Sequence, residues 1–324
     1  MQDLLAAYYD VQTEDIAVLD NRHGNKSGDN IYFIISAADK EAIHMEQAAL
    51  AYYLAENNYP NLAIPVRTKH GDWFIEHQGK HYLVLQVNEQ RKQISSSPGR
   101  QLAEFHQLGA MYQYEPKETS SYGQWRKLWI DKLTLYENHL TNEAKENPCA
   151  YYRLVKDMFP YIIGISENAI QYVQETEQEN RFDQVDQGTI SFKRYQDSVA
   201  NSVLWTDSLV YDHPARDLAE YIRTYFLQEE EKNADINQFL QDYQSIRPLS
   251  IFSWRLVYAR LIFPIHLFDV LERGLFQRAT YDQLYQELVY LLAKQQRYEQ
   301  RLGDFFANLD IDQQGLQIPV LHWV

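Results

Sequence analysis

The sequence predicts an α+β protein with two lobes, a small lobe built on an antiparallel sheet and a larger lobe that is mostly α-helical. Three observations predict this. Short β-prone runs fill the first third of the chain around one helical segment. A polar stretch with Ser95-Ser96-Ser97-Pro98 follows. Beyond it, helical periodicity dominates. The predicted domains are therefore 1–88, a linker at 89–98, and 99–324.

The small lobe is expected to contain about five strands and one helix. The polar segment 21–30, with two glycines, predicts a loop between two strands. The strands are predicted at 15–20, 31–36, 63–68, 72–77 and 81–87. The helix is predicted at 39–56, and an apolar stripe at helical spacing predicts its buried face. That stripe consists of Ala42, Met45, Ala49, Tyr52 and Tyr53.

The larger lobe is expected to be helical at 99–112, 125–140 and 151–177. The β-branched segment 188–210 predicts an embedded β-hairpin with its turn near Asp197. Helices resume at Pro214, a residue suited to a first helical position. Thr280 and Gln283 form a capping box, which predicts a long last helix through 302.

The segment 249–271 is the most apolar long stretch, but Arg255, Arg260 and His266 interrupt it. It therefore predicts a pair of buried helices and argues against a membrane span. The formal net charge of −15 and the pI of about 5.1 argue against nucleic acid and against an anionic membrane surface as partners. Cys149 is the single cysteine, which excludes an internal disulfide. The first nine residues lack the features of a secretory signal.

Several segments, in this order along the chain, resemble a known family. They are Ile64–Asp72 with Gly79–Leu85, then Leu102–Gln107, and finally Val210–Ala219, which reads Y-D-x-P-x-R-D-L-A from its second residue. The chain resembles the YutH-like spore coat proteins, in the CotS-like branch of the aminoglycoside phosphotransferase and choline kinase-like superfamily. The resemblance covers nearly the whole chain. It implies a bilobal, protein-kinase-like fold of the aminoglycoside phosphotransferase type.

Within this resemblance, the sequence departs from an active kinase at each catalytic position. The family's His-Gly-Asp-x4-Asn loop corresponds to 187–194, so Thr189 replaces the base and Arg194 replaces a magnesium ligand. A hydroxyl is too weak a base at neutral pH, and an arginine is never deprotonated. The later metal-binding aspartate corresponds to Trp205, and Asp207 is a remnant acid two residues further on. No lysine lies in 31–36 to pair with Glu46 and the phosphates.

The resemblance therefore implies a catalytically inactive pseudokinase, with no catalytic residue, cofactor or metal. It implies a spore coat or coat-assembly protein involved in sporulation, made in the cytoplasm of the mother cell and then placed in the spore coat. Other coat proteins are the implied partners. We expect Asp212, Arg216 and Asp217 to be structural and to brace the loop before the helix at Pro214.

Two other functions stay open at this point. An unorthodox phosphotransferase would use Asp207, Asp183 or Asp186 as base or metal ligand. A nucleotide- or small-ligand-binding module would keep the cleft without chemistry, and the acidic surface would favour a cationic compound. The pair Asp197…Asn201 is one residue short of the family spacing, and these residue types predict a turn. The sequence identifies neither a specific partner or ligand nor an oligomeric state.

Overall fold

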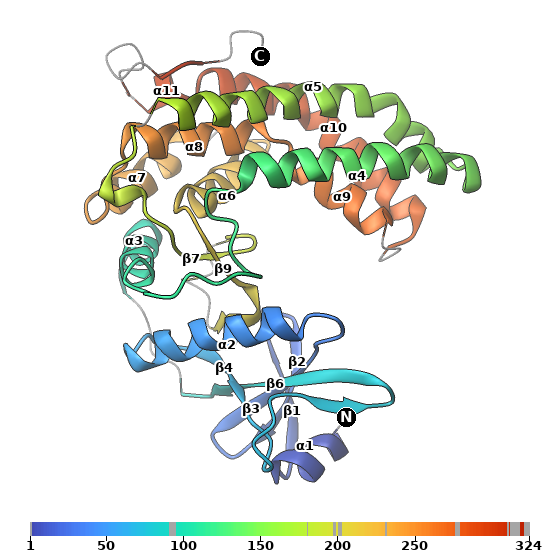
Figure 1. The fold of residues 1–324 in the computed structure, drawn as a ribbon, viewed down its shortest axis with the longest axis vertical. Coiled ribbons are helices and arrows are strands. Elements are labelled where there is room, and N and C mark those ends of the chain that lie inside the picture. Colours follow the sequence, from blue (N-terminus) through green and yellow to red (C-terminus); the bar gives the residue numbers. More distant parts are fainter. Residues whose placement is uncertain are drawn as a thin grey trace. The chain divides into compact units, whose positions relative to one another are not determined.

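The computed structural model describes residues 2–90, 95–179, 181–196, 199, 203–230, 232–275, 279–309, 311 and 318–320. The chain forms two compact units (Figure 1). Unit 1 comprises 1–120, 188–212 and 242–247, and unit 2 comprises 121–187, 213–241 and 248–324. The domain boundaries predicted from the sequence stay a prediction. Residues 91–94 of the predicted linker and the predicted turn at Asp197 lie outside the described residues.

Unit 1 is built on a seven-stranded sheet with the order β1-β2-β3-β6-β4-β8, in which β5 also pairs with β6. The strands are β1 (Asp15–Leu19), β2 (Arg22–Ser27), β3 (Asn30–Ser36), β4 (Leu62–Val66), β5 (Ile75–His77), β6 (Lys80–Asn88) and β8 (Leu204–Trp205). Every pairing is antiparallel except that of β4 with β8. The antiparallel pairing predicted for the strands before residue 88 is confirmed, and β8, which comes from a later segment and pairs in parallel with β4, makes the complete sheet mixed.

Strand β2 occupies the segment predicted to be a loop, so that prediction is wrong. Tight turns enclose this strand. Asp20 and Asn21 have φ of 47° and 62° before it, and Gly28 has φ of 55° after it. Paired left-handed residues of these types are typical of two-residue hairpin turns. A Cβ atom at Gly24 would lie 2.6 Å from Ile31 and Phe33, so this glycine lets β2 pack closely on the core.

One apolar core cluster of unit 1 lies on one face of this sheet. Alternate residues of β3 and β6 point to that face, because side chains alternate along a strand. The cluster consists of Ile31, Phe33, Ala63, Leu83, Leu85, Val87, Val203 and Trp205. The helix α1 (Gln2–Tyr9), which the sequence did not predict, contributes Leu4 and Leu5 to the buried apolar residues.

Helix α2 (Glu41–Glu56) forms where the sequence predicts it, but the predicted buried face is wrong. Met45 and Tyr52 are 37% and 39% exposed. Contacts with β4 and with the 3₁₀ turn η2 (Thr206–Ser208) select the neighbouring stripe of the helix. That stripe is formed by His44, Gln47, Ala48, Leu50, Ala51 and Leu54. Tyr52 tolerates its exposed position because its hydroxyl donates to the Pro65 carbonyl at 2.9 Å.

The segment 188–212 contributes two further strands to unit 1. Strands β7 (Thr189–Phe192) and β9 (Leu209–Asp212) pair with each other in an antiparallel, two-stranded sheet. They form the β-structure predicted for 188–210. Strand β8 lies between them in sequence but pairs with β4 in the larger sheet. Helix α3 (Pro98–Gly109) packs on β7.

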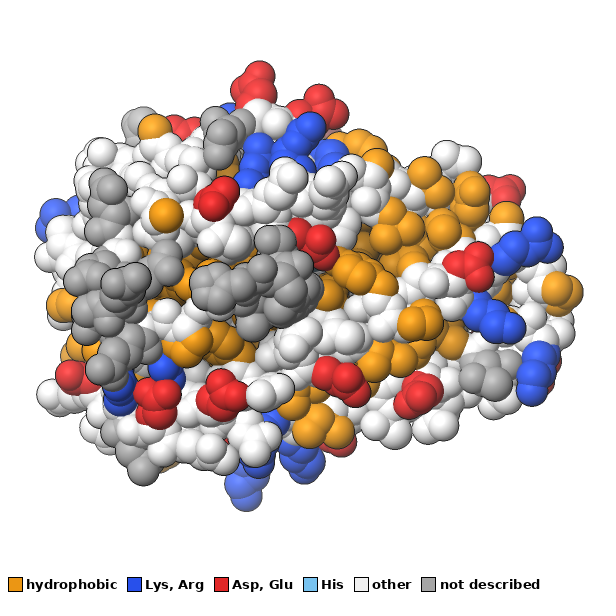
Figure 2. All heavy atoms as spheres, turned by 90° about the horizontal axis from the view of Figure 1, so that it is seen from above, with side chains coloured by type: hydrophobic (Ala, Val, Ile, Leu, Met, Phe, Trp, Pro, Cys, Tyr) orange, Lys and Arg blue, Asp and Glu red, His pale blue; other side chains and the backbone are white. Residues whose placement is uncertain are grey.

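Unit 2 is helical in the part that the structure describes. Its helices are α4 (Trp125–Glu146), α5 (Ala150–Gln178), α6 (Ala215–Phe226), α7 (Asn233–Gln244), α8 (Ile251–Ile262), α9 (Ile265–Leu275), α10 (Tyr281–Gly303) and α11 (Phe305–Asn308). The last three residues of α7 are grouped with unit 1. The predicted capping box of Thr280 and Gln283 is confirmed at the start of α10. Figure 2 shows one face of the molecule, where hydrophobic side chains are exposed among acidic and basic ones.

Helices α8 and α9 are the buried pair predicted from the sequence, because residues 253–268 are all buried. Their charged side chains are paired. Arg255 lies 2.7 Å from the Glu179 carboxylate and Arg260 lies 3.2 Å from that of Glu220. By length and apolar composition, no single described helix suffices to cross a membrane. The α8–α9 pair meets that test only when taken together, across a bend of 48°.

Candidate functional site

Thr189, the predicted replacement for the catalytic base, lies inside β7 and is fully buried. Its hydroxyl donates to the backbone carbonyl of His106 at 2.7 Å. Arg247 Nη1 donates to the same carbonyl at 2.8 Å. Since α3 carries His106, these two hydrogen bonds hold α3, β7 and residue 247 together inside unit 1. The Thr189 side chain is therefore used to stabilise the fold.

Arg194, the predicted replacement for a magnesium ligand, follows β7. Its Nη1 donates to the backbone carbonyl of Lys193 at 2.8 Å. Lys193 Nζ in turn donates to the backbone carbonyl of Asp207 at 2.9 Å. Thr189 belongs to the two-stranded sheet and Trp205 to the seven-stranded sheet, and the bonds of Lys193 to the Asp207 and Ser208 carbonyls join the segments that follow them.

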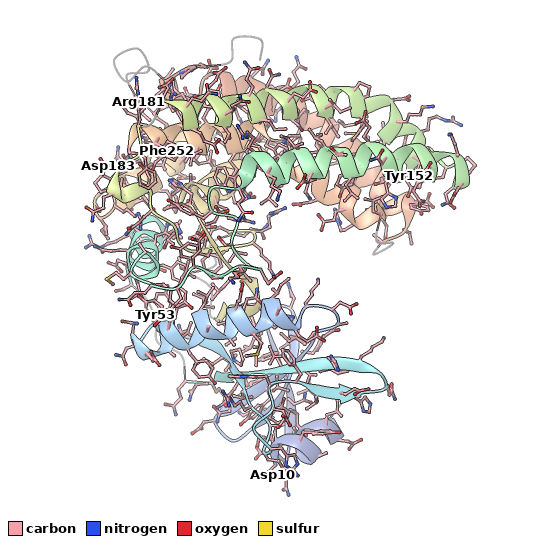
Figure 3. The ribbon with its side chains drawn as sticks, in the orientation of Figure 1. Asp10, Tyr53, Tyr152, Arg181, Asp183 and Phe252 are labelled. Carbon is pink, nitrogen blue, oxygen red and sulfur yellow. The ribbon has the colours of Figure 1, made fainter. Side chains whose placement is uncertain are left out.

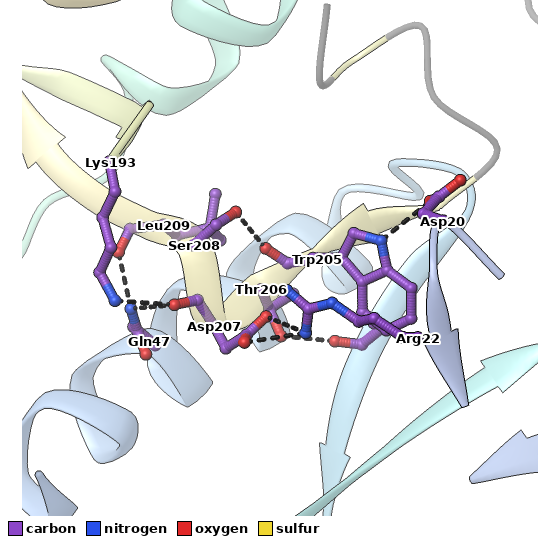
Figure 4. Close-up of polar contacts among 10 residues, drawn as sticks. Asp20, Arg22, Gln47, Lys193, Trp205, Thr206, Asp207, Ser208 and Leu209 are labelled. Atoms are coloured by element: carbon purple, nitrogen blue, oxygen red, sulfur yellow. Dashed lines mark hydrogen bonds and ion pairs between the residues drawn. The ribbon is translucent and has the colours of Figure 1, made fainter. Parts of the chain in front are cut away.

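Trp205, at the predicted position of the metal-binding aspartate, is part of the core of unit 1 (Figure 4). Its side chain is buried, and its ring meets the edge of Phe33 with 4.8 Å between centroids. The indole Nε1 donates to Asp20 Oδ2 at 2.9 Å. The guanidinium of Arg22 lies over the indole ring, 4.1 Å from its centroid. An aspartate at this position would bury a carboxylate in an apolar cluster.

Asp207, the predicted remnant acid, is held by contacts from three segments of unit 1. Its two carboxylate oxygens lie 3.0 and 2.9 Å from Arg22 Nη1. Its backbone carbonyl accepts from Gln47 Nε2 at 2.9 Å as well as from Lys193. Gln47 Nε2 also donates to the Leu209 carbonyl, which fixes η2 against α2 (Figure 4). We call Asp20, Arg22, Trp205 and Asp207 the Asp207 cluster.

Glu46, predicted to lack a lysine partner, has other partners in unit 1. Its carboxylate accepts hydrogen bonds from the backbone N–H groups of Lys117, Glu118 and Thr119 and from the Thr119 hydroxyl, at 2.7 to 3.1 Å. Burial raises the pKa of Glu46, but the backbone hydrogen bonds outweigh it and the net pKa is lowered. Glu46 therefore serves as an anionic anchor for the segment 117–119.

Sequence reasoning missed Arg22, Gln47 and Lys193. Arg22 was placed in a predicted loop, although the Asp20-Asn21 pair before it is a recognisable hairpin-turn signal. Gln47 lies outside the apolar stripe that the sequence predicts for this helix, and it is buried in the structure. No local signal links these residues to Asp207, because up to 185 positions separate them in the chain.

The other candidate acids lie in unit 2, where Asp183 precedes the 3₁₀ turn η1 (Gln184–Asp186) (Figure 3). Asp186 is fully buried. Its Oδ1 accepts from the hydroxyls of Ser250 at 2.6 Å and Ser253 at 2.5 Å, and lies 3.4 Å from His213 Nε2. Its Oδ2 accepts from the Asp183 backbone N–H at 2.7 Å.

The protonation of Asp186 follows from these contacts. Burial raises the pKa of Asp186. Hydrogen bonds from His213, Ser250 and Ser253 lower this pKa by more than burial raises it, so the net pKa lies below the usual value. The carboxylate is ionised at neutral pH and its oxygens are occupied by protein donors. It is therefore positioned as a structural hub rather than as a base for a substrate.

The residues predicted to be structural lie on both sides of the point after residue 212 at which the chain passes from unit 1 to unit 2. Asp212 ends β9 in unit 1 and is fully buried. Arg216 and Asp217 lie in the first turn of α6 in unit 2, and Asp217 is also fully buried. Arg216 Nη1 donates to the Ser121 hydroxyl at 2.9 Å. The bracing role stays a prediction, and these burials support it. Within the described residues, no three His, Cys, Asp or Glu side chains are grouped as a metal site requires.

Comparison with known sequences gives two matches. The family model described as "Spore coat putative kinase YutH" matches residues 2–305. The endospore coat-associated protein YutH of Bacillus subtilis (strain 168) is 35% identical over 309 residues, which cover 91% of this chain and 89% of that protein.

Comparison with solved structures gives similar proteins at low identity. An aminoglycoside phosphotransferase from Alicyclobacillus acidocaldarius has a TM-score of 0.63 at 12% identity, and the match covers 96% of both chains. The amicoumacin kinase hAmiN has a TM-score of 0.55 at 12% identity, covering 97% of this chain and 95% of that chain. A microcompartment-associated aminopropanol kinase has a TM-score of 0.58 at 11% identity, covering 95% and 97%. These similarities confirm the predicted fold of the aminoglycoside phosphotransferase type.

Proposed function

We propose that this chain, which belongs to the YutH family of spore coat putative kinases, is a catalytically inactive kinase-like protein of the endospore coat. The fold and the family are the premise. Loss of phosphate transfer, and a place in the coat, are the proposal.

The observation that carries the proposed inactivity is the ion pair of Asp207 with Arg22, at 2.9 Å. A kinase uses carboxylate and amide oxygens to hold magnesium, which neutralises the transferring phosphate. Here the remnant acid Asp207, two residues after the predicted metal position, already faces a fixed cation. A dication placed beside Asp207 would be repelled by the guanidinium or would have to displace it. The guanidinium is itself held in place over the Trp205 ring.

The two other predicted positions support the same conclusion. Thr189 is buried with its hydroxyl bonded to the His106 carbonyl, and Trp205 is packed in the core of unit 1. Each of these side chains therefore has a structural use that conflicts with a role in binding a nucleotide. Glu46, the acid that would pair with a lysine in an active kinase, binds the backbone of 117–119 instead.

The proposed location follows from the relative in Bacillus subtilis, which is described as endospore coat-associated. We propose that this chain is made in the mother cell cytoplasm and then joins other coat proteins on the spore. A fluorescent fusion expressed from its own promoter and imaged through sporulation tests this. A ring around the forespore is expected, and a signal that stays diffuse in the mother cell would contradict the proposed location.

Calorimetric titration with ATP, with and without magnesium, tests the proposed inactivity. We expect no magnesium-dependent binding in the micromolar range for the wild-type chain or for Arg22→Met, because Trp205 remains in place in both. An active aminoglycoside phosphotransferase serves as the positive control. If the wild-type chain bound ATP only with magnesium, the proposal would be wrong and an unorthodox nucleotide site would replace it. Asp207→Asn would then show whether Asp207 is the ligand.

A further inference from the structure

Unit 1 carries a groove of about 470 Å³ that the predicted kinase positions do not use. Among the described residues that line it, half carry a carboxamide side chain and none carries a charge. We call it the carboxamide groove, after Asn30, Asn58, Asn61, Gln86, Asn88 and Gln90. Its volume falls within the range of about 300–1,000 Å³ that is typical of small-ligand sites.

The strand register assembles this groove on the sheet face opposite the apolar core. Asn30 of β3 lies directly across from Asn88 of β6, and Gln86 lies across from Ile64 of β4. The residues next to these groove residues in sequence, Ile31, Val87 and Ala63, belong to the core cluster. Because successive side chains of a strand point to opposite faces, the groove side chains lie on the face away from that cluster.

The turn after α2 adds two more carboxamides to the groove. Asn58 and Asn61 have φ of 57° and 56°, a conformation that asparagine tolerates better than most residues. The β4 side chains of Leu62, Ile64 and Val66 form an apolar strip in the lining, which also includes Ala55, Tyr59 and Pro60. The groove therefore combines an apolar strip from β4 with amide groups from two strands, β3 and β6, from one turn and from the segment after β6.

Most of these amides have unused hydrogen-bonding capacity. In the described part of the chain, the side-chain amides of Asn30, Asn58, Gln86 and Gln90 form no hydrogen bond with another protein group. Asn88 Oδ1 accepts from the Gln90 backbone N–H at 2.8 Å, and its amide nitrogen donates to no group in the described part of the chain. Each carboxamide offers two donors and one acceptor. The described lining of the groove thus presents paired donors and acceptors without a formal charge, in a chain whose net charge is −15.

We propose that the carboxamide groove binds a neutral polyhydroxylated ligand, a short saccharide. Adjacent hydroxyl groups match the donors and acceptors of a carboxamide, and the C–H face of a sugar ring matches the apolar strip. A phosphate or carboxylate ligand would lose its hydration without gaining a counter-charge. This inference goes beyond the proposed function and does not depend on it.

An uncharged extended peptide is the competing ligand class, and the topology disfavours it. Extended peptides are commonly recognised by main-chain pairing at an open sheet edge. Strand β4 pairs with β6 on one side and with β8 on the other, and β6 pairs with β3 and β4. Under the groove, β6 is therefore paired on both sides, and β4 is paired with β6 at Ile64–Val66 and with β8 at Leu62 and Ala63.

Saturation-transfer NMR and calorimetry with cellobiose, maltose and N,N′-diacetylchitobiose test the proposal on the full chain. We expect at least one of them to bind in the millimolar range, with glucuronate and ATP not competing. Gln86→Met with Gln90→Met should weaken binding at least about tenfold, since the shape is kept and two amides are lost. Gln107→Met is the matched control, because Gln107 is exposed on α3 of the same unit.

Each outcome decides the proposal. Circular dichroism checks the fold of the double variant, and Gln90→Met alone, at an exposed position, replaces it if the double variant does not fold. If none of the three saccharides bound, or if the double variant bound as tightly as Gln107→Met, the assigned site would be wrong. If a blocked Ser-Gly octapeptide bound through Gln86 and Gln90 while the saccharides did not, the ligand class would be wrong.

Discussion

Unit 1 and unit 2 use charged side chains in different ways. Of the nine Asp, Glu, Lys and Arg residues that are buried in the described part of the chain, seven belong to unit 2. Asp186 is bonded to two serine hydroxyls and a backbone N–H, and Glu220 lies between Arg223 at 2.9 Å and Arg260 at 3.2 Å. In the Asp207 cluster of unit 1, by contrast, Arg22 and Asp207 are 34% and 19% exposed.

This difference indicates that acidic side chains contribute more to the stability of unit 2 than to that of unit 1. In unit 2, buried acids are fixed by several donors, so they stabilise the fold and are shielded from any ligand. In unit 1, the acid that resembles a metal ligand is close to solvent and is neutralised by one ion pair. The two units should therefore respond differently to the loss of a charge, and the following predictions test this in order of expected size.

The largest effect is expected from Asp186→Ala in unit 2. The variant leaves Ser250, Ser253 and the Asp183 backbone N–H without their common acceptor in a fully buried site. We expect the free energy of unfolding to fall by about 3 kcal/mol, as for other broken buried polar networks. Urea denaturation measures this free energy of unfolding. The control is Asp157→Ala, which removes an exposed carboxylate from the same unit. A loss below about 0.5 kcal/mol would show that unit 2 does not depend on this acid.

In unit 1, packing rather than charge should control stability, and Gly24→Ala tests this. The added Cβ would lie 2.6 Å from Ile31 and Phe33, which are both core residues. We expect a loss of about 2 kcal/mol from overpacking. Gly164→Ala is the matched control in unit 2, because no atom lies within 4 Å of its added Cβ. That control should be neutral or slightly stabilising, since alanine favours a helix. Equal losses in both variants would contradict the predicted packing of β2.

His266 in unit 2 should make stability depend on pH. Burial, and then the charge of Arg223, lower the pKa of His266 to about 4. In the unfolded chain the His266 imidazole binds a proton near pH 6.5, whereas in the folded chain this imidazole stays neutral down to about pH 4. The contribution of neutral His266 to the free energy of unfolding is therefore fully present above pH 6.5, and it is lost as the pH falls towards 4. We expect a slope of up to about 1.4 kcal/mol per pH unit in this window.

Unfolding measured at several pH values tests this expectation with His266→Gln. The slope between pH 6.5 and 4 should become flatter in this variant, whereas the exposed His139→Gln should keep the wild-type slope. An unchanged slope in His266→Gln would mean that His266 is protonated in the folded chain, and that unit 2 tolerates a buried charge at this position.

The smallest effect is expected from Arg22→Met in the Asp207 cluster. The ion pair is partly exposed, and the contact with the Trp205 ring adds little where solvent is near. We expect a loss of about 1 kcal/mol by thermal unfolding. Arg100→Met, which removes an exposed pair with Glu104, should change stability by less than about 0.5 kcal/mol. A loss as large as that of Asp186→Ala would remove the contrast between the two units.

Local patterns in the sequence determined much of the secondary structure. The helices α3, α4, α5 and α10 follow from apolar residues at helical spacing, and the start of α10 follows from a capping box of two residues. Strands β1, β3 and β6 follow from β-prone runs bounded by turns. The ordered resemblance to YutH-like spore coat proteins then indicated the fold and the family, because it depends on motifs that are contiguous in the chain.

The tertiary structure alone decided the partners of the candidate site. Arg22 meets Asp207 across 185 positions, Gln47 meets Leu209 across 162, and Glu46 meets Lys117 across 71. The buried face of α2 and the pairing of β8 with β4 depend on the same contacts. A periodic pattern records which residues share a face, but two similar stripes on one helix have nearly equal local energies. Packing against distant strands, which no short segment encodes, selects between them.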